Sequence, residues 1–90
     1  MTLKKKTTKL DKLIGKNVQK LRKKYNISRV QLANSMNVDY KTLWNCENGF
    51  NTLSINLLLK MQPLFKTKNI TLEMLFNYIV ISAVQEYENQ

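Results

Sequence analysis

One short segment, NVDYKTLWNCENG at residues 37–49, concentrates side chains that could bind a partner. Leu43 and Cys46 lie three residues apart, on one side of a short amphipathic helix, and we expect both in the core. The other side carries an ammonium group, an amide and two aromatic rings with polar atoms: Lys41, Asn45, Tyr40 and Trp44. These groups can make directional hydrogen bonds and indicate a recognition surface. The alternative is that the two aromatic residues are partly buried packing residues, as aromatic side chains usually are.

The remaining inventory of residues argues against catalysis and metal binding. The chain has no histidine, one cysteine and two glycines, so it lacks the usual components of zinc sites, histidine-based catalysis and glycine-rich phosphate loops. Cys46 cannot form a disulfide within the chain, which indicates a cytoplasmic location. No apolar run follows the N-terminal lysines, and no segment of about 18 apolar residues occurs, so we expect neither a signal peptide nor a membrane span. We predict a non-enzyme without a cofactor, a metal or a small-molecule ligand.

The positive charge is confined to the first third of the chain. Residues 1–30 hold eleven basic side chains and one acidic side chain, a balance of +10. Residues 31–90 hold four basic and five acidic side chains, a balance of −1. This asymmetry predicts a polyanionic partner, which could be DNA, RNA or an anionic membrane surface. A merely solubilising, hydrated face is the other interpretation.

The elements that must position these side chains can be predicted from spacing and capping residues. Residues 1–9 are basic and lack periodicity, so we expect a flexible arm. The first helix runs from residue 10 to Asn26, which tolerates the left-handed conformation. Ser28 caps the second helix, which Asn37 ends, and Asp39 caps the third helix, which ends near residue 49. Both of these helices are too short to be stable alone and require neighbouring helices.

Two further helices follow. Ser54 caps the fourth helix, which we expect to end near Gln62 because Pro63 would interrupt it. Thr71 caps the fifth helix.

The C-terminal segment is apolar on two sides. The first stripe at helical spacing consists of Leu72, Leu75, Phe76, Ile79, Val80, Ala83, Val84 and Tyr87, and the second consists of Met74, Tyr78 and Ile81. A helix with two apolar sides needs two partners. One partner is the core and the other would be a second copy of the chain, with Tyr78, Ile81, Val84 and Tyr87 in the dimer contact. A short strand at residues 78–81 is the competing interpretation, because these residues are good strand formers.

Residues 27–49, ISRVQLANSMNVDYKTLWNCENG, have the order of a helix-turn-helix. This run resembles the Cro/CI-type (XRE-family) helix-turn-helix of phage repressors, most specifically at Leu32-Ala33, Asn37-Val38 and Glu47-Asn48-Gly49. IGKNVQKLRKK, residues 14–24, is similar to the family's first helix. The resemblance implies an all-α fold: a compact five-helix lambda-repressor-like domain at residues 10–76, and a helical C-terminal extension at residues 77–90.

The resemblance also implies roles for individual residues. Family members often begin the second helix with Ser or Thr and then a Gln that bonds a phosphate; here Ser28 is kept and Arg29, which suits a phosphate or a guanine, replaces the Gln. Among the base-reading positions, Lys41 suits guanine and Asn45 suits adenine. Thr42 suits a phosphate or a thymine methyl group. The implied DNA-contacting set is Ser28, Arg29, Asp39, Tyr40, Lys41, Thr42, Trp44 and Asn45, with Lys4, Lys5 and Lys6 from the basic arm. The positions of Arg22 and Glu47 carry a structural ion pair in several members.

These features together predict a sequence-specific, double-stranded-DNA-binding transcriptional regulator. It would act as a repressor and bind an inverted-repeat operator as a homodimer, with residues 39–48 in the major groove. The alternative is the DNA-binding antitoxin of a toxin–antitoxin pair, in which the C-terminal segment covers a toxin. An RNA-binding protein is less favoured, because the sequence lacks strand-borne stacking aromatics.

Overall fold

The computed structural model describes residues 8–90 and is built from helices. The elements are α1 (Lys9–Lys24), α2 (Arg29–Met36), α3 (Tyr40–Glu47), α4 (Ile55–Lys66), α5 (Leu72–Phe76), the π-helix η1 (Asn77–Ile81) and α6 (Ser82–Glu88). The predicted all-α class is confirmed, and the alternative of a strand at residues 78–81 is wrong. The predicted contacts of Lys4, Lys5 and Lys6 lie outside the described residues.

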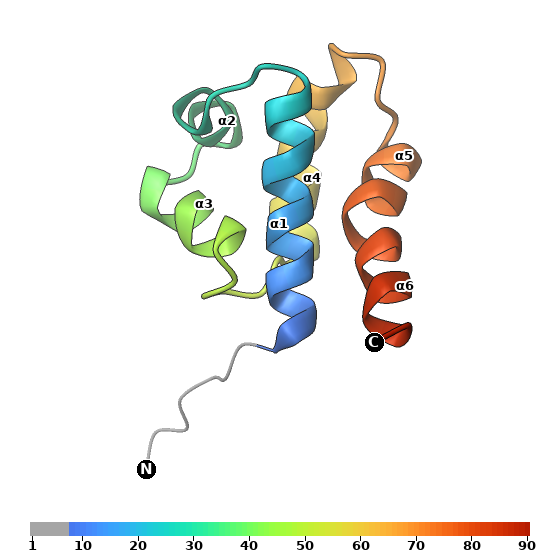
Figure 1. Ribbon diagram of the computed structural model, residues 1–90. Helices are drawn as coiled ribbons and strands as arrows, with labels where there is room; N and C mark the ends of the chain where they lie inside the picture. Colours follow the sequence, from blue (N-terminus) through green and yellow to red (C-terminus); the bar gives the residue numbers. More distant parts are fainter. Residues whose placement is uncertain (1–7) are drawn as a thin grey trace.

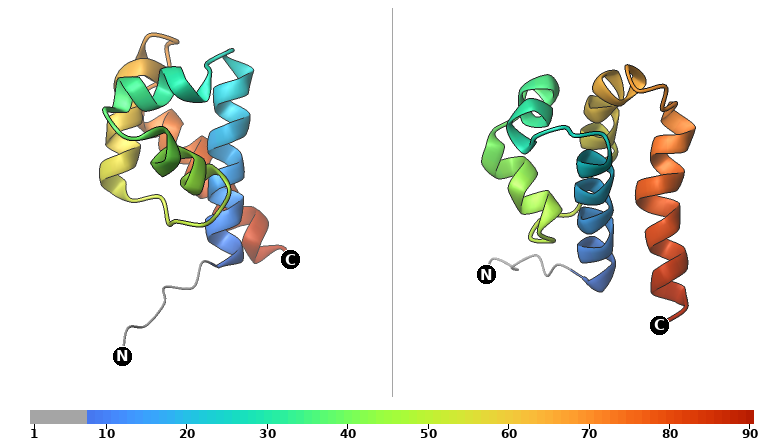
Figure 2. Two further views of the ribbon diagram at one scale, coloured as in Figure 1. Left: turned by 90° about the vertical axis from the view of Figure 1, so that its left-hand side faces the viewer. Right: turned by 45° about the horizontal axis from the view of Figure 1, so that its top comes forward.

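The helix α1 is the centre of the arrangement. It contacts α3 on one flank and η1 and α6 on the other, while α4 contacts α2 and α5. Figure 1 shows α2 and α3 to one side of α1, the continuous α5–η1–α6 rod to the other side, and α4 behind. The two flanks are also separate in the right-hand view of Figure 2. The short helices α2 and α3 therefore have the neighbouring helices that they require.

Capping residues explain where most of the helices begin and end. The Ser28 hydroxyl accepts a hydrogen bond from Gln31 N at 3.0 Å, as predicted for the start of α2. Asn26 and Asn37, which follow α1 and α2, both have φ near +57°, the left-handed conformation expected of them. Asp39 occupies the N-cap position of α3, as predicted, although its side chain makes no capping hydrogen bond. The exposed Asp39 carboxylate remains available at this helix end.

Pro63 lies inside α4, and the expectation that this helix ends near Gln62 is wrong. A proline in a helix loses the hydrogen bond to the carbonyl four residues earlier, which belongs here to Leu59. Both Pro63 and Leu59 lie on the exposed side of α4, where water can hydrate that carbonyl. Phe65, two residues further on, is fully buried and anchors the last turn to the core. Its burial offsets the lost bond, and α4 continues to Lys66.

The core is continuous across the boundary predicted at residue 76. Its fully buried side chains include Val18, Leu21, Leu32, Leu43, Met61, Phe65, Leu75 and Ile79. Ile79 and Ala83 belong to the predicted extension, yet both are 0% exposed. Residues 77–88 therefore complete the core and do not form a separate extension.

The π-helix η1 explains how the C-terminal rod keeps one face on α1. Leu75, Ile79 and Ala83 repeat every four residues, a spacing that drifts by about 40° per repeat around a regular α-helix. The wider π turn takes up this drift, so all three side chains are buried. The buried Asn17 amide of α1 donates to Ile79 O at 3.1 Å and fixes this turn. Nothing in the sequence pattern predicted this contact.

Candidate nucleic-acid interface

The helices α2 and α3 are joined by residues 37–39 and pack against each other. Val38 N donates to Ala33 O at 3.1 Å, which closes the turn after the left-handed Asn37. Leu43 and Cys46 are each 1% exposed, so the inner side of α3 faces the core as predicted. The left-hand view of Figure 2 shows the two short helices and their connecting turn.

A buried ion network holds α3 in place. The Glu47 carboxylate, whose side chain is 0% exposed, accepts from Arg22 Nε at 2.8 Å and from Arg22 Nη2 at 3.0 Å. The predicted Arg22–Glu47 pair is thus present as a two-point contact between α1 and α3. Arg22 Nη1 also donates to Ile27 O at 3.0 Å, which ties the loop before α2 to the same pair.

Arg29 joins this network, which the sequence did not predict. Arg29 Nε donates to Glu47 Oε1 at 3.0 Å, and Arg29 Nη1 donates to the Tyr40 hydroxyl at 2.8 Å. Its guanidinium also lies 5.5 Å from the centre of the Tyr40 ring. Burial lowers the pKa of Arg29, but the hydrogen bonds with Tyr40 and Glu47 outweigh that effect and raise the pKa above its ordinary value. Arg29 therefore stays charged and links the start of α2 to both ends of α3.

The outer side of α3 is open to solvent. Tyr40 is 47% exposed and Trp44 is 38% exposed, so the interpretation of these rings as core residues does not apply. Lys41 is exposed, whereas Thr42 and Asn45 are half-buried beside it. Ser28 and Asp39 are exposed at the starts of α2 and α3. Five of the eight predicted contact residues of α2 and α3 are thus exposed, and Arg29, Thr42 and Asn45 are partly accessible.

Phe50 extends this surface and was missed from the sequence. Its ring stacks on Trp44 with centroids 5.7 Å apart and an interplanar angle of 16°. Phe50 is itself 61% exposed, so the pair forms an apolar platform at the end of α3. Its position just after the Gly49 turn is the signal that could have identified it, since an apolar residue in such a turn usually packs on the preceding helix.

Gly15 lets α1 approach the C-terminal end of α3. A Cβ at this position would lie 2.1 Å from Cys46 O and 2.9 Å from Glu47 O. No other residue type fits between the two backbones without a displacement. A glycine inside a helical pattern was the available signal, because it lowers helix stability and usually has a packing reason.

Cys46 contributes to packing and has low reactivity. Burial, together with the nearby Glu47 and Asp11 charges, raises the pKa of the Cys46 thiol to about 12.

The residues predicted to form a dimer contact lie on the outer side of the C-terminal rod. Tyr78, Ile81 and Tyr87 are between 36% and 44% exposed, and Val84 is half-buried. Met74, at 50% exposed, extends the same apolar stripe.

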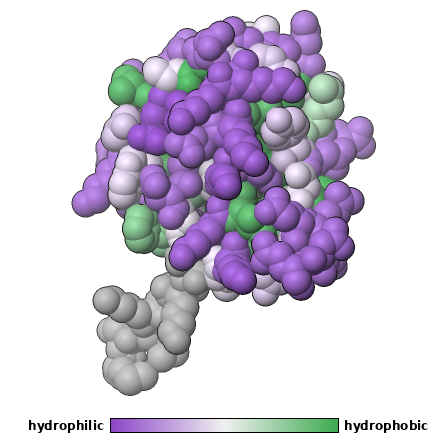
Figure 3. All heavy atoms as spheres, viewed as in Figure 1, coloured by the Kyte–Doolittle hydropathy of each residue, from purple (hydrophilic) through white to green (hydrophobic). Residues whose placement is uncertain are grey.

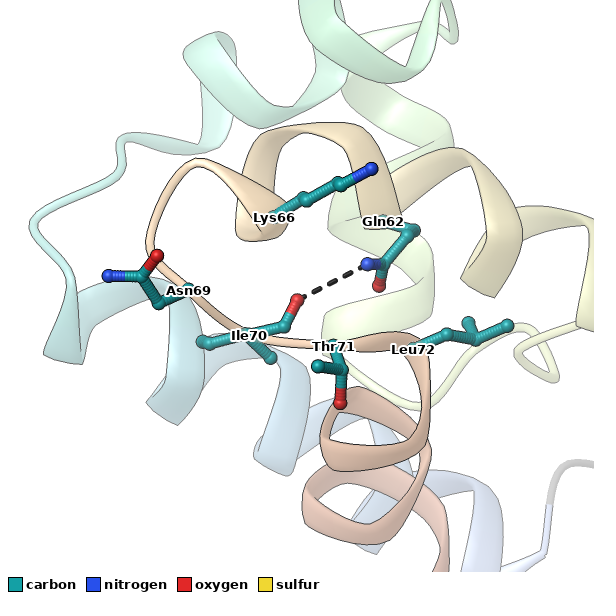
Figure 4. A pocket seen from close by; sticks show the side chains of 6 residues that line it. All are labelled: Gln62, Lys66, Asn69, Ile70, Thr71 and Leu72. Atoms are coloured by element: carbon teal, nitrogen blue, oxygen red, sulfur yellow. Dashed lines mark hydrogen bonds between the residues drawn. The ribbon is translucent and has the colours of Figure 1, made fainter.

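A hollow of about 450 Å³ lies away from α2 and α3, where α4 turns into α5. Figure 4 shows Gln62 bridging this turn through a hydrogen bond from Nε2 to Ile70 O at 3.2 Å. In the same view the Lys66 side chain extends toward Gln62, whereas Leu72 extends away from both. The hollow shares no residue with the outer side of α3.

No protein-family model matches this sequence, and no curated protein or solved structure matches it either. Within residues 8–90, no helix combines the length and apolar character that a membrane crossing requires.

Proposed function

We propose that this protein is a sequence-specific, double-stranded-DNA-binding transcriptional regulator of the Cro/CI type. It acts as a repressor by binding an inverted-repeat operator as a homodimer. The observation that carries the proposal is the pairing of α2 with α3, in which a buried ion network fixes α3 while Tyr40, Lys41 and Trp44 remain exposed. In a helix-turn-helix, the first helix crosses the DNA backbone and the second enters the major groove.

The side chains divide into two roles in this proposal. Lys41 and Asn45 read base edges, because an ammonium group suits guanine O6 and N7 and an amide suits adenine N6 and N7. Arg29 and the Tyr40 hydroxyl contact a phosphate. Two of the five Arg29 N–H donors are used by Glu47 and Tyr40, and the others have no partner among residues 8–90. The Tyr40 oxygen accepts from Arg29, so its own O–H is directed elsewhere.

The exposed Tyr78, Ile81 and Tyr87, together with the half-buried Val84, supply the dimer contact in this proposal. Half-site centres would then lie about 34 Å apart, or one helical turn of DNA.

The test is selection of bound DNA from a randomised pool at about 150 mM salt, where nonspecific phosphate binding is weakened. We expect an enriched inverted repeat, and we expect Lys41→Ala to lose the preference at one position in each half-site. Lys60→Ala is the control, because Lys60 is also exposed but lies on α4. Failure to enrich any sequence would refute the proposed reading of an operator.

The exposed C-terminal stripe also favours a second candidate, a DNA-binding antitoxin whose C-terminal segment binds a toxin. The two candidates differ in the state of the isolated chain. Sedimentation equilibrium of the wild type and of Tyr78→Glu separates them. A dimer that the substitution dissociates supports the repressor, whereas a wild-type monomer that selects a single half-site supports the antitoxin.

A further inference from the structure

A row of lysines covers the solvent side of α1. Lys9, Lys12, Lys16, Lys20 and Lys23 are all exposed, and their spacing of three or four residues places them on one face of the helix. At 1.5 Å per residue this lysine face is about 21 Å long. Figure 3 has the viewpoint of Figure 1, in which α1 lies nearest to the viewer. Hydrophilic side chains cover most of this face of the molecule.

No carboxylate neutralises the lysine face within the described part of the chain. Asp11, the only acid of α1, is 8% exposed and accepts from the Thr8 N–H and hydroxyl. Glu47 of α3 is buried and is shared by Arg22 and Arg29. Glu86 and Glu88 of α6 are exposed, but neither forms an ion pair with a lysine in residues 8–90. Five like charges in a row repel each other and destabilise the helix, so their arrangement needs a reason outside the fold.

Most of the face is turned away from α3. Gly15 marks the side of α1 that contacts α3, and Lys16 and Lys20 lie about 100° and about 140° around the helix from it. Lys12 lies closer, about 60° from Gly15, and its stem packs against Gly49 just after α3. A polyanion on the lysines would therefore leave Lys41 and Asn45 free. A membrane surface fits poorly, because the apolar side chains that would insert, such as Val18 and Leu21, are at most 1% exposed.

We infer that the lysine face of α1 is a second, sequence-independent binding surface for the phosphate backbone of duplex DNA. The choice of duplex DNA as the polyanion rests on the proposed function. The lysines are evenly spaced along the helix axis, which suits a rigid polyanion with evenly spaced charges. Each ammonium group can neutralise one phosphate. This surface would strengthen binding to any sequence and would leave the preference read by α3 unchanged.

The test compares two triple variants of equal net charge on a random-sequence duplex. The first is Lys12→Gln/Lys16→Gln/Lys20→Gln, and the matched control is Lys60→Gln/Lys66→Gln/Lys68→Gln, which changes three exposed lysines of α4 and the turn after it. Affinity is measured by fluorescence anisotropy over a range of salt concentrations, after circular dichroism has shown that both variants are folded. The slope of log affinity against log salt should become shallower by up to about 2.7 per protomer in the α1 variant. The control should retain the wild-type slope.

Each outcome decides the inference. Equal slopes in the two variants would overturn it, because the effect would then follow net charge alone. If the α1 variant lost binding to vesicles of anionic lipid while its DNA binding stayed at the wild-type level, the inference would be overturned in favour of a membrane surface. Two differently labelled duplexes show where the bound phosphates come from. Energy transfer between them that is lost only in the α1 variant would mean that the lysine face binds a second duplex. A shallower slope in the α1 variant without energy transfer would mean that the face binds the backbone of the same duplex, beside the site of α3. Because random DNA is used, the result is independent of whether an operator is found.

Discussion

Replacing Glu47 with Gln should remove much of the stability of the domain. The Glu47 carboxylate is 0% exposed and accepts three hydrogen bonds, two from Arg22 and one from Arg29. The substitution Glu47→Gln preserves the shape of the side chain but leaves the Arg22 guanidinium, 7% exposed, without its counter-charge. Breaking a buried pair from one side costs about 3–5 kcal/mol. A 90-residue domain is stable by about 5–13 kcal/mol, so the loss is a large fraction of the total.

Arg29→Met provides the internal comparison. The Arg29 side chain is 18% exposed and supplies only one of the three hydrogen bonds to Glu47. Its removal leaves the Arg22–Glu47 pair complete, so we expect a cost of about 1–2 kcal/mol. In the Glu47→Gln background, Arg29→Met should cost less than in the wild type, because the carboxylate it contacts is already gone.

Urea and thermal unfolding followed by circular dichroism measure these differences. In a domain of this size each kcal/mol lowers the Tm by about 4–8 °C. The Tm should therefore fall far more in Glu47→Gln than in Arg29→Met. A cost below about 1 kcal/mol for Glu47→Gln, or equal costs for the two variants, would refute the central role assigned to the carboxylate.

Four further predictions concern residues of α1 and α3. Gly15→Ala should destabilise the domain by about 2 kcal/mol or more, because its Cβ would lie 2.1 Å from Cys46 O; thermal unfolding measures this, and an unchanged Tm would contradict it. Asn17→Ala should cost about 1–3 kcal/mol and speed amide exchange in η1, since the Ile79 carbonyl loses a buried donor; exchange rates equal to the wild type would contradict it. Cys46 should resist alkylation at pH 8 until the chain unfolds, because its pKa is raised to about 12. The free energy of unfolding should also fall as pH rises from 9.0, the ordinary pKa, toward 12, since the unfolded thiol ionises first.

Local features of the chain were predictable from sequence because their causes are local. Ser28, Ser54 and Thr71 each accept a hydrogen bond from the backbone three residues later, as their side chains favour at a helix start. Asn26 and Asn37 adopt the left-handed conformation that few other residues tolerate. The buried side of α3 could also be distinguished from its exposed side, because apolar residues three positions apart share a face of a helix.

Features that depend on tertiary contacts were not predictable in this way. The continuation of α4 through Pro63 depends on the burial of Phe65, which local helix preference does not encode. Arg29 reaches Glu47 from 18 residues away and Asn17 reaches Ile79 from 62 residues away. Periodicity reports which face of a helix is apolar, but it does not report which polar side chain on another helix will meet it. The Arg22–Glu47 pair was predicted only because the family resemblance supplied its long-range pairing.

The ion network of Arg22, Arg29 and Glu47 would contribute a positive charge to the proposed interface. Glu47 neutralises one of the two guanidinium groups that contact it, so Arg22, Arg29 and Glu47 together carry a net charge of +1. Arg22 is buried, which leaves this charge accessible mainly through Arg29 at the start of α2, where the helix dipole is also positive. An anionic phosphate bound there would contact a group that is already held in place by Glu47 and Tyr40, so little side-chain freedom would be lost on binding. The same contact joins α2 to Tyr40 at the first turn of α3, so a phosphate held by Arg29 would also set the angle at which α3 enters the groove.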